Sequence, residues 1–233
     1  DQTEQDILRL AAGKHGRLHI AIECHSCFEW LMPTIDEYRE DWPDVEIDLI
    51  SGFNFEPLPA LTRSELDLVI TSDPQPLAGI RYIPLFEYEA LLCVGKNHPL
   101  AKKALIEPQD FSDQTLITYP VESGRLDVFK YFLQPAGVAP VATRTAELTL
   151  MIIQLVASGR GVCVLPNWAI SDYLAKGYVV ARSLGDDGVW AKLYAAVRDE
   201  NAGQPYMEAF VHTAREISQK TLKGILQVEL PEN

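Results

Sequence analysis

Two cysteines, a histidine and a serine stand together near the N-terminus, in the segment Glu23-Cys24-His25-Ser26-Cys27. Cys24 and Cys27 have C-x-x-C spacing, and His25 adds a third ligand of the kind that zinc accepts. The same two thiols could serve a redox reaction. No second Cys pair lies nearby in the sequence. We therefore predict no metal here and expect a polar loop that binds a ligand, while the redox role stays a hypothesis.

Ser26 has a second reading, because it stands three residues before Glu29. That spacing is typical of a capping box at the start of a helix. The first-turn N–H groups of a helix also bind anions. Ser26 and the backbone of Cys27 are therefore candidates for holding a ligand carboxylate. N-capping alone also explains Ser26, and the two roles are compatible.

Three further polar residues, Thr71, Ser72 and Asp73, follow the apolar run LDLVI. Asp73 could supply the countercharge for an ammonium group. Asp and Ser before a proline also favour a loop, so turn chemistry explains these residues equally well.

A second set of candidates lies in the later half of the chain. Tyr119 could offer its hydroxyl to a ligand, although it also suits a half-buried strand position. Arg144 could bind a carboxylate through two parallel hydrogen bonds or form a surface ion pair. For Asn167 a helix-capping role is favoured. The candidates in this half are Tyr119, Pro120, Arg144, Thr145 and Pro166.

Catalytic motifs are missing from the sequence, which contains neither G-x-S-x-G nor H-E-x-x-H. Gly159-Arg160-Gly161 is too short for a nucleotide-binding fingerprint and precedes a strand-like run. Ser26, His25 and Asp73 could be combined into a triad, but a triad is defined by its geometry. We predict no catalytic residues and a protein that is not an enzyme.

The first group of candidates falls between predicted strands and helices. Alternating apolar residues predict strands at 17–23 and 45–51, and helical spacing predicts a helix at 27–42. Strands that alternate with helices of this length are typical of βαβ units and a largely parallel sheet. Ligands bind at the carboxyl ends of strands in such sheets. The loops at 23–27 and 71–73 are therefore predicted to lie at the same edge.

The later half repeats this organisation. Strands are expected at 115–119, 141–145 and 161–165, with a helix at 147–158. The final helix is expected to begin near Pro205.

Extended segments near 88–95 and 190–197 predict an α/β fold of two lobes joined by two crossover strands. We expect one lobe to comprise residues 1–95 and 191–233, and the other to comprise residues 96–190. The first twelve residues are expected to end a preceding helix, and the last residues, QVELPEN, to form a loose tail.

The composition is that of a soluble globular protein, with 47% hydrophobic and 23% charged residues. A net charge of −13 argues against nucleic-acid binding by this chain, because such binding rests mainly on cationic contacts. No apolar run approaches the roughly 20 residues of a membrane span, and the first residues do not resemble a signal peptide. We predict no membrane contact and a cytoplasmic location, where Cys93 and Cys163 would be buried thiols.

Four segments together resemble the effector-binding domain of LysR-type transcriptional regulators. They are LHIAIECHSCFEWLMPTIDEYREDWPDVEIDLISG, LTRSELDLVITSD, LLCVGKNHPLA and IIQLVASGRGVCVLPNWAI. Each segment alone is a weak match, but their order and spacing are specific and cover most of residues 15–200.

The resemblance implies two Rossmann-like lobes of the type 2 periplasmic-binding-protein kind, with a ligand cleft between them. It implies a homodimer formed by this domain through residues 28–42 and 147–158, and a tetramer of the full-length protein. DNA would be bound only by an N-terminal winged helix-turn-helix domain that is absent from this chain. Within the family the chain is most similar to regulators of methionine biosynthesis genes, which implies homocysteine as the effector and no cofactor. Two alternatives stay open, a stand-alone cytosolic small-molecule binding protein and an enzyme on the same scaffold.

Overall fold

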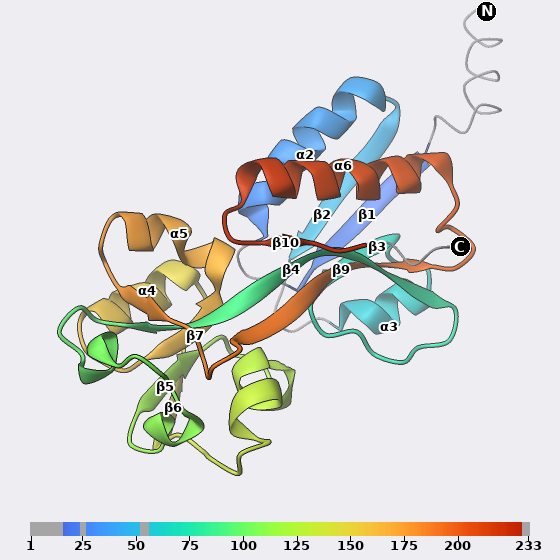
Figure 1. Ribbon diagram of the computed structural model, residues 1–233. Helices are drawn as coiled ribbons and strands as arrows, with labels where there is room; N and C mark the ends of the chain where they lie inside the picture. The colour runs from blue at the N-terminus through green and yellow to red at the C-terminus, as the bar shows by residue number, and fades with distance from the viewer. Residues whose placement is uncertain (1–15, 24–26, 52–55, 230–233) are drawn as a thin grey trace, which may run out of the picture. The chain divides into compact units, whose positions relative to one another are not determined.

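The computed structural model describes residues 16–23, 27–51 and 56–229 (Figure 1). The chain forms two compact units, and each contains segments that are distant in the sequence. Unit 1 comprises residues 1–86, 192–222 and 227–233, and unit 2 comprises residues 87–191 and 223–226. Strand β4 (Ile80–Val94) continues from unit 1 into unit 2, and strand β9 (Val189–Arg198) returns. The expected helix end at residues 1–12 lies outside the described residues.

Unit 1 is built on a sheet whose central strands are parallel. β1 (Gly16–Ile22) lies between β2 (Val45–Ser51) and β3 (Leu68–Thr71) and is parallel to both. β9 is antiparallel to β3, with Thr71 opposite Tyr194. Leu18 and Ile20 are fully buried, as the alternation of apolar residues predicts for a strand with a covered face.

Helices cover both faces of this sheet. α2 (Phe28–Asp41) and α6 (Pro205–Thr221) lie on one face and α3 (Pro57–Thr62) lies on the other (Figure 1). The buried Tyr38 joins the first two helices, because its ring packs edge-on against Phe210 and its hydroxyl donates to the carbonyl of Tyr206 at 3.0 Å. α2 ends before Trp42-Pro43, where proline disfavours helical geometry in the preceding residue.

Unit 2 combines two sets of strands. The second half of β4 is antiparallel to β7 (Cys163–Pro166) and β8 (Val180–Arg182). β5 (Thr115–Thr118) is parallel to β6 (Ala142–Thr145), and Leu116 also forms a parallel bridge with Val162. The remaining elements are α4 (Thr149–Ala157), α5 (Asn167–Ala175) and the shorter helices η1 (Pro99–Lys102), η2 (Pro108–Phe111), η3 (Ser123–Arg125) and η4 (Val128–Leu133).

The core of unit 2 contains the two predicted buried thiols. Cys93 of β4 stands directly opposite Cys163 of β7. Both side chains are free and fully buried, which confirms their expected place in the core. Burial raises the pKa of the Cys163 thiol well above its usual range, and hydrogen bonding with Cys93 adds to this effect.

Two expectations about the elements differ from the structure in detail. The extended segment expected near 88–95 is the second half of the longer strand β4, which pairs with β7, β8, β9 and β10. The expected loose tail, QVELPEN, starts with Gln227, which is the second residue of β10 (Leu226–Gln227) and so belongs to a strand paired with β4. The tail residues 230–233 lie outside the described residues. No helix in the described part of the chain is long and apolar enough to cross a membrane.

Candidate functional site

The carboxyl ends of β1 and β3 meet in unit 1. The Glu23 N–H, just beyond β1, donates to the Ile70 carbonyl of β3 at 3.0 Å. The residues that follow the two strands therefore start from neighbouring positions, as expected for parallel strands. Cys24, His25 and Ser26 lie outside the described residues, so the ligand role predicted for them stays a prediction.

Cys27 begins the helix that starts at this edge. It is the N-cap residue of α2, it is fully buried, and its sulfur belongs to a disulfide. The Cys27 side chain does not cap the helix, and Glu29 lies in the first turn. Ser26, the other member of the predicted capping box, lies outside the described residues, so the capping box stays a prediction. The first-turn N–H groups of a helix can bind an anion, and this role of α2 also stays a prediction.

Thr71, Ser72 and Asp73 form a turn at the end of β3. Thr71 is fully buried, and its Oγ1 accepts a hydrogen bond from the Asp73 N–H at 3.0 Å. Ser72 and Asp73 are half-buried. The turn chemistry expected from these residue types is confirmed, and it fixes the direction of the backbone that carries the Asp73 carboxyl group.

Two tyrosines that sequence reasoning missed accompany this turn. The rings of Tyr82, on β4, and Tyr194, on β9, pack edge-on with centroids 6.2 Å apart. The Tyr82 hydroxyl accepts a hydrogen bond from the Gln75 N–H at 3.2 Å. Burial raises the pKa of Tyr82; the Gln75 hydrogen bond opposes this, and the negative charges of Glu23 and Asp73 add to it. Two carboxylates and two phenol groups therefore lie near the end of β3.

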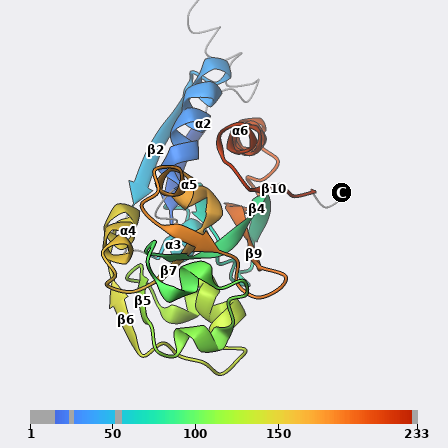
Figure 2. The same ribbon diagram turned by 60° about the vertical axis from the view of Figure 1, so that its left-hand side comes forward.

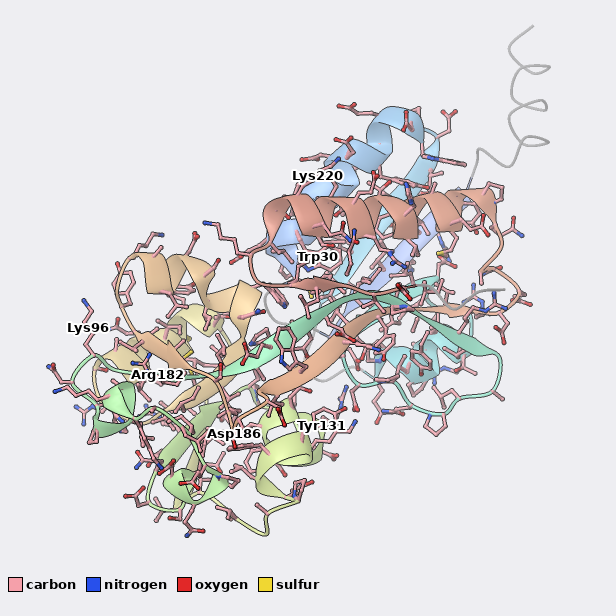
Figure 3. All side chains as sticks on the ribbon, in the orientation of Figure 1. Trp30, Lys96, Tyr131, Arg182, Asp186 and Lys220 are labelled. Atoms are coloured by element: carbon pink, nitrogen blue, oxygen red, sulfur yellow. The ribbon has the colours of Figure 1, made fainter. Side chains whose placement is uncertain are left out.

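Only the strand pairing could have revealed these tyrosines. Tyr194 is the register partner of Thr71, although 123 positions separate them in the printed sequence. Trp30, in the first turn of α2, is a second residue that the sequence did not single out (labelled in Figure 3). It is fully buried against Phe86, and its indole N–H has no acceptor among the residues that the structure describes.

The second group of candidates gathers at one edge of unit 2. The register of β5 and β6 pairs Thr118 with Thr145, and the Ala146 N–H donates to the Thr118 carbonyl at 2.9 Å. The Ile117 N–H donates to the Val162 carbonyl at 2.8 Å and brings in the chain that enters β7. All three strands therefore run in the same direction, and Tyr119, Pro120, Thr145 and Pro166 stand at their carboxyl ends.

The side chains at this edge are arranged as follows. The Tyr119 hydroxyl lies 2.7 Å from Oγ1 of Thr149, the first residue of α4. Arg144 is exposed. Carboxylate binding and a surface ion pair, the two roles considered for Arg144, both stay predictions. Asn167 is the first residue of α5, and its Oδ1 accepts from the Trp168 N–H at 2.8 Å. The N-cap residue is Pro166, so the helix-capping role expected for Asn167 is wrong by one position.

Comparisons with known proteins agree with this architecture. The model of the LysR substrate binding domain matches residues 11–219. The HTH-type transcriptional regulator MetR of Escherichia coli (strain K12) is 46% identical over 92% of this chain and 67% of its own length. The MetR of Haemophilus influenzae is 43% identical over 97% of this chain and 73% of its own length.

A solved structure is similar in fold as well as in sequence. The regulatory domain of MetR from N. meningitidis matches with a TM-score of 0.85 and 45% identity, covering 92% of this chain and 99% of that chain. This match confirms the predicted α/β fold of the type 2 periplasmic-binding-protein kind. The relatives are transcriptional regulators, so the prediction that the protein is not an enzyme is confirmed and the enzyme alternative is discarded. The chain belongs to the LysR-type transcriptional regulators, and it forms a regulatory, substrate-binding domain similar to that of MetR.

Proposed function

We propose that this domain senses homocysteine and transmits its binding to a DNA-binding domain of the helix-turn-helix type. The observation that carries the proposal is the gathering of polar groups at the strand ends of each unit, in a chain that is 46% identical to MetR. An amino acid needs one site for its carboxylate and one for its ammonium group. The described residues supply both kinds of group.

The ammonium group has its partners in unit 1. The Asp73 carboxyl group is held on a turn by the buried Thr71 hydroxyl, and its negative charge acts on Tyr82 together with that of Glu23. Two carboxylates at the end of one strand favour a cationic ligand group over an anionic one.

The carboxylate has a candidate partner in the same unit. The first turn of α2 presents N–H groups at the positive end of the helix dipole. Unit 2 offers a carboxylate partner of its own, because Arg144 presents an exposed guanidinium whose planar fork matches a carboxylate with two hydrogen bonds. The hydroxyls of Tyr119 and Thr149, 2.7 Å apart, add donors and acceptors at the edge that carries Arg144.

Calorimetric titration of the chain with homocysteine, methionine and cysteine under reducing conditions tests the effector. We expect saturable heat for homocysteine and much weaker heat for the other two, with a matching rise in melting temperature. Asp73→Asn should weaken homocysteine binding about tenfold or more, since a hydrogen bond to a charged group contributes about 1.5–3 kcal/mol. Asp186→Asn, the same change on the exposed loop after β8 (labelled in Figure 3), is the matched control. An absence of binding by all three amino acids would reject homocysteine.

We also propose that the domain forms a homodimer in which α2 of one copy packs against α4 of the other. α2 exposes Phe28 and Met32, and the start of α4 exposes Leu148, Leu150 and Met151. The neighbouring strands β2 and β6 are edge strands of their sheets, with unpaired backbone on one side. Two different apolar patches on one chain can both be covered in a two-fold dimer, where each patch meets the other patch of the partner.

The dimer is tested by the molecular mass in solution. Met32→Glu and Leu150→Glu should each shift the protein toward monomer in size-exclusion chromatography with light scattering, because a carboxylate would be buried in an apolar contact. Tyr178→Glu is the control, since Tyr178 is 53% exposed and lies outside both helices. Equal dimer content in all three variants would reject this interface.

In the full-length protein we expect tetramers in the cytoplasm that bind DNA through an N-terminal winged helix-turn-helix domain. Homocysteine would act through the difference between its affinities for two arrangements of the regulatory domain. Footprinting of an operator upstream of a methionine biosynthesis gene, with and without homocysteine, is the direct test. Identical footprints at saturating homocysteine would show that the ligand does not control DNA contact.

A further inference from the structure

The strand pair of β4 and β7 brings two thiols together in unit 2. Cys93 of β4 and Cys163 of β7 are direct register partners, although 70 positions separate them in the printed sequence. β7 runs beside the second half of β4 in both views of the ribbon (Figure 1, Figure 2). Unit 2 contains residues 87–191, so the whole pair belongs to one compact unit.

The placement of the two side chains suits a disulfide bond. Residues directly opposite each other on antiparallel strands have Cα atoms about 4.5 or 5.5 Å apart. Disulfide bonds join residues whose Cα atoms are about 4.4–6.8 Å apart. Both cysteines belong to one apolar cluster, together with Ile117, Ile152 and Val156. The two sulfurs therefore lie on the same side of the sheet, and a bond between them needs no change of strand register.

The two thiols already interact in their reduced state. The Cys93 thiol donates to the Leu91 carbonyl at 3.7 Å, and the Cys163 and Cys93 side chains form a hydrogen bond with each other. Thiols are weak donors and weak acceptors, so these contacts orient the sulfurs without holding them strongly. Burial raises the pKa of the Cys163 thiol and keeps it protonated. Large or charged reagents should therefore react with this pair slowly.

We propose that Cys93 and Cys163 form an oxidisable pair that a hydroperoxide closes to a cross-strand disulfide. Hydrogen peroxide suits the apolar cover, because it is uncharged and close to water in size. In the first step, one sulfur attacks a peroxide oxygen and the O–O bond breaks. The thiol proton joins the departing hydroxide as water, and a sulfenic acid remains.

In the second step, the other sulfur attacks the sulfenic sulfur. The S–S bond forms, the S–O bond breaks, and the second thiol proton leaves with the hydroxide as water. The two thiols have then lost two electrons, and one peroxide has been reduced to two waters. The new bond fixes β7 to β4 three residues before Pro166, at the candidate edge of unit 2. This oxidation does not depend on the identity of the effector.

Peptide mapping of the unaltered chain tests the pair. The folded chain is treated with hydrogen peroxide, its remaining thiols are alkylated in urea, and it is digested with trypsin without a reductant. Cleavage after Lys and Arg places Cys93 on peptide 82–96 and Cys163 on peptide 161–176, whereas Cys27 falls on peptide 18–39. We expect peptides 82–96 and 161–176 to be joined, with the loss of two hydrogens, and to separate on addition of dithiothreitol.

Two buried cysteines that only fill space would give another result. Both peptides would then carry the alkyl group after treatment of the folded chain, and the joined pair would appear only when peroxide is added in urea. That result would overturn the oxidisable pair. Circular dichroism before digestion shows that the treated chain is still folded.

The matched controls are Cys93→Ala and Cys163→Ala, since each keeps one thiol and cannot form the bond within the chain. Peroxide should raise the melting temperature of the unaltered chain by about 4 °C or more relative to its effect on either variant, because the bond restricts the unfolded chain. If one variant does not fold, the other is a sufficient control. An equal effect on the unaltered chain and a folded variant would overturn the covalent fixing of β7 to β4.

Discussion

Asp67 is the acceptor at the centre of a buried charge cluster, and its removal should destabilise unit 1 strongly. Asp67 is 8% exposed and immediately precedes β3. Its carboxylate accepts from the His19 N–H at 3.0 Å and from Nη2 of Arg198 at 3.1 Å, with Nε of Arg17 at 3.4 Å. The Arg198 side chain is only 11% exposed, so Asp67→Ala would leave a buried guanidinium with one carboxylate less.

The size of this destabilisation depends on the hydrogen-bond and ion-pair partners that Arg198 keeps after the substitution. Breaking a buried ion pair costs about 3–5 kcal/mol. Arg198 still donates to the carbonyls of Leu61 and Leu66, and Glu200 lies 3.4 Å from its Nε. The loss should therefore lie at the lower end, about 3 kcal/mol. For a chain of this size that lowers the melting temperature by roughly 6–12 °C.

Urea unfolding followed by circular dichroism measures this loss. Asp199→Ala is the matched control, because Asp199 also pairs with an arginine at 3.1 Å, yet the two side chains are 57% and 53% exposed. An exposed pair contributes about 0–1 kcal/mol, so the control should stay close to the unaltered chain. Equal losses for Asp67→Ala and Asp199→Ala would refute the reasoning from burial. Homocysteine affinity should change little in Asp67→Ala. Asp67 precedes the first residue of β3, whereas the candidate site lies beyond Thr71, the last residue of that strand.

Three further outcomes are expected. Thr71→Val leaves the Asp73 N–H without its acceptor, so the free energy of unfolding should fall by about 1 kcal/mol. Calorimetry should also show weaker homocysteine binding. Unchanged binding would show that this turn does not contribute to the homocysteine site. Gly161→Ala places a Cβ against the Thr115 carbonyl at a φ of +152° and should cost about 3 kcal/mol in urea unfolding, whereas Gly159→Ala, with nothing within 4 Å, should cost about 1–2 kcal/mol. Burial, with a contribution from Tyr206, raises the pKa of Tyr38 well above its usual range. The unfolded chain therefore ionises first, and stability should fall by up to about 1.4 kcal/mol per pH unit above about pH 10. Tyr38→Phe should flatten that slope, and an equal slope in both proteins would contradict the assignment.

The strands and helices followed from local patterns wherever one face of an element is buried. Leu18 and Ile20 alternate with more exposed residues, which gives β1 its period, and Trp42-Pro43 ends α2 through the backbone restriction of proline. Local pattern failed where a distant partner decides the conformation. β4 is continuous because other strands pair with it along its length, and β10 forms because β4 supplies its partner.

The sequence was sufficient to predict which kind of residue forms the candidate site and at which strand ends it lies. Polar residues that follow buried strands are recognisable in the sequence, and parallel strands must bring their carboxyl ends to one edge. Thr71 with Asp73, and Tyr119 with Thr145, lie at such ends. The roles of individual side chains were less predictable. The cap of α5 is Pro166 and not the expected Asn167, because a cap depends on the backbone angles of one residue and a one-residue shift changes few local contacts.

The sequence by itself determined the fold class, the family and the edges at which a ligand is expected, because hydrophobic periodicity and the order of the four family segments are properties of the chain. The tertiary structure alone decided which distant residues meet. Tyr194 reaches Thr71 through strand register, Arg198 reaches Asp67 across the sheet, and Asn167 reaches Gly224 through the course of the tail. These contacts join residues separated by long stretches of chain, and only the packing of whole elements brings such residues within hydrogen-bond distance.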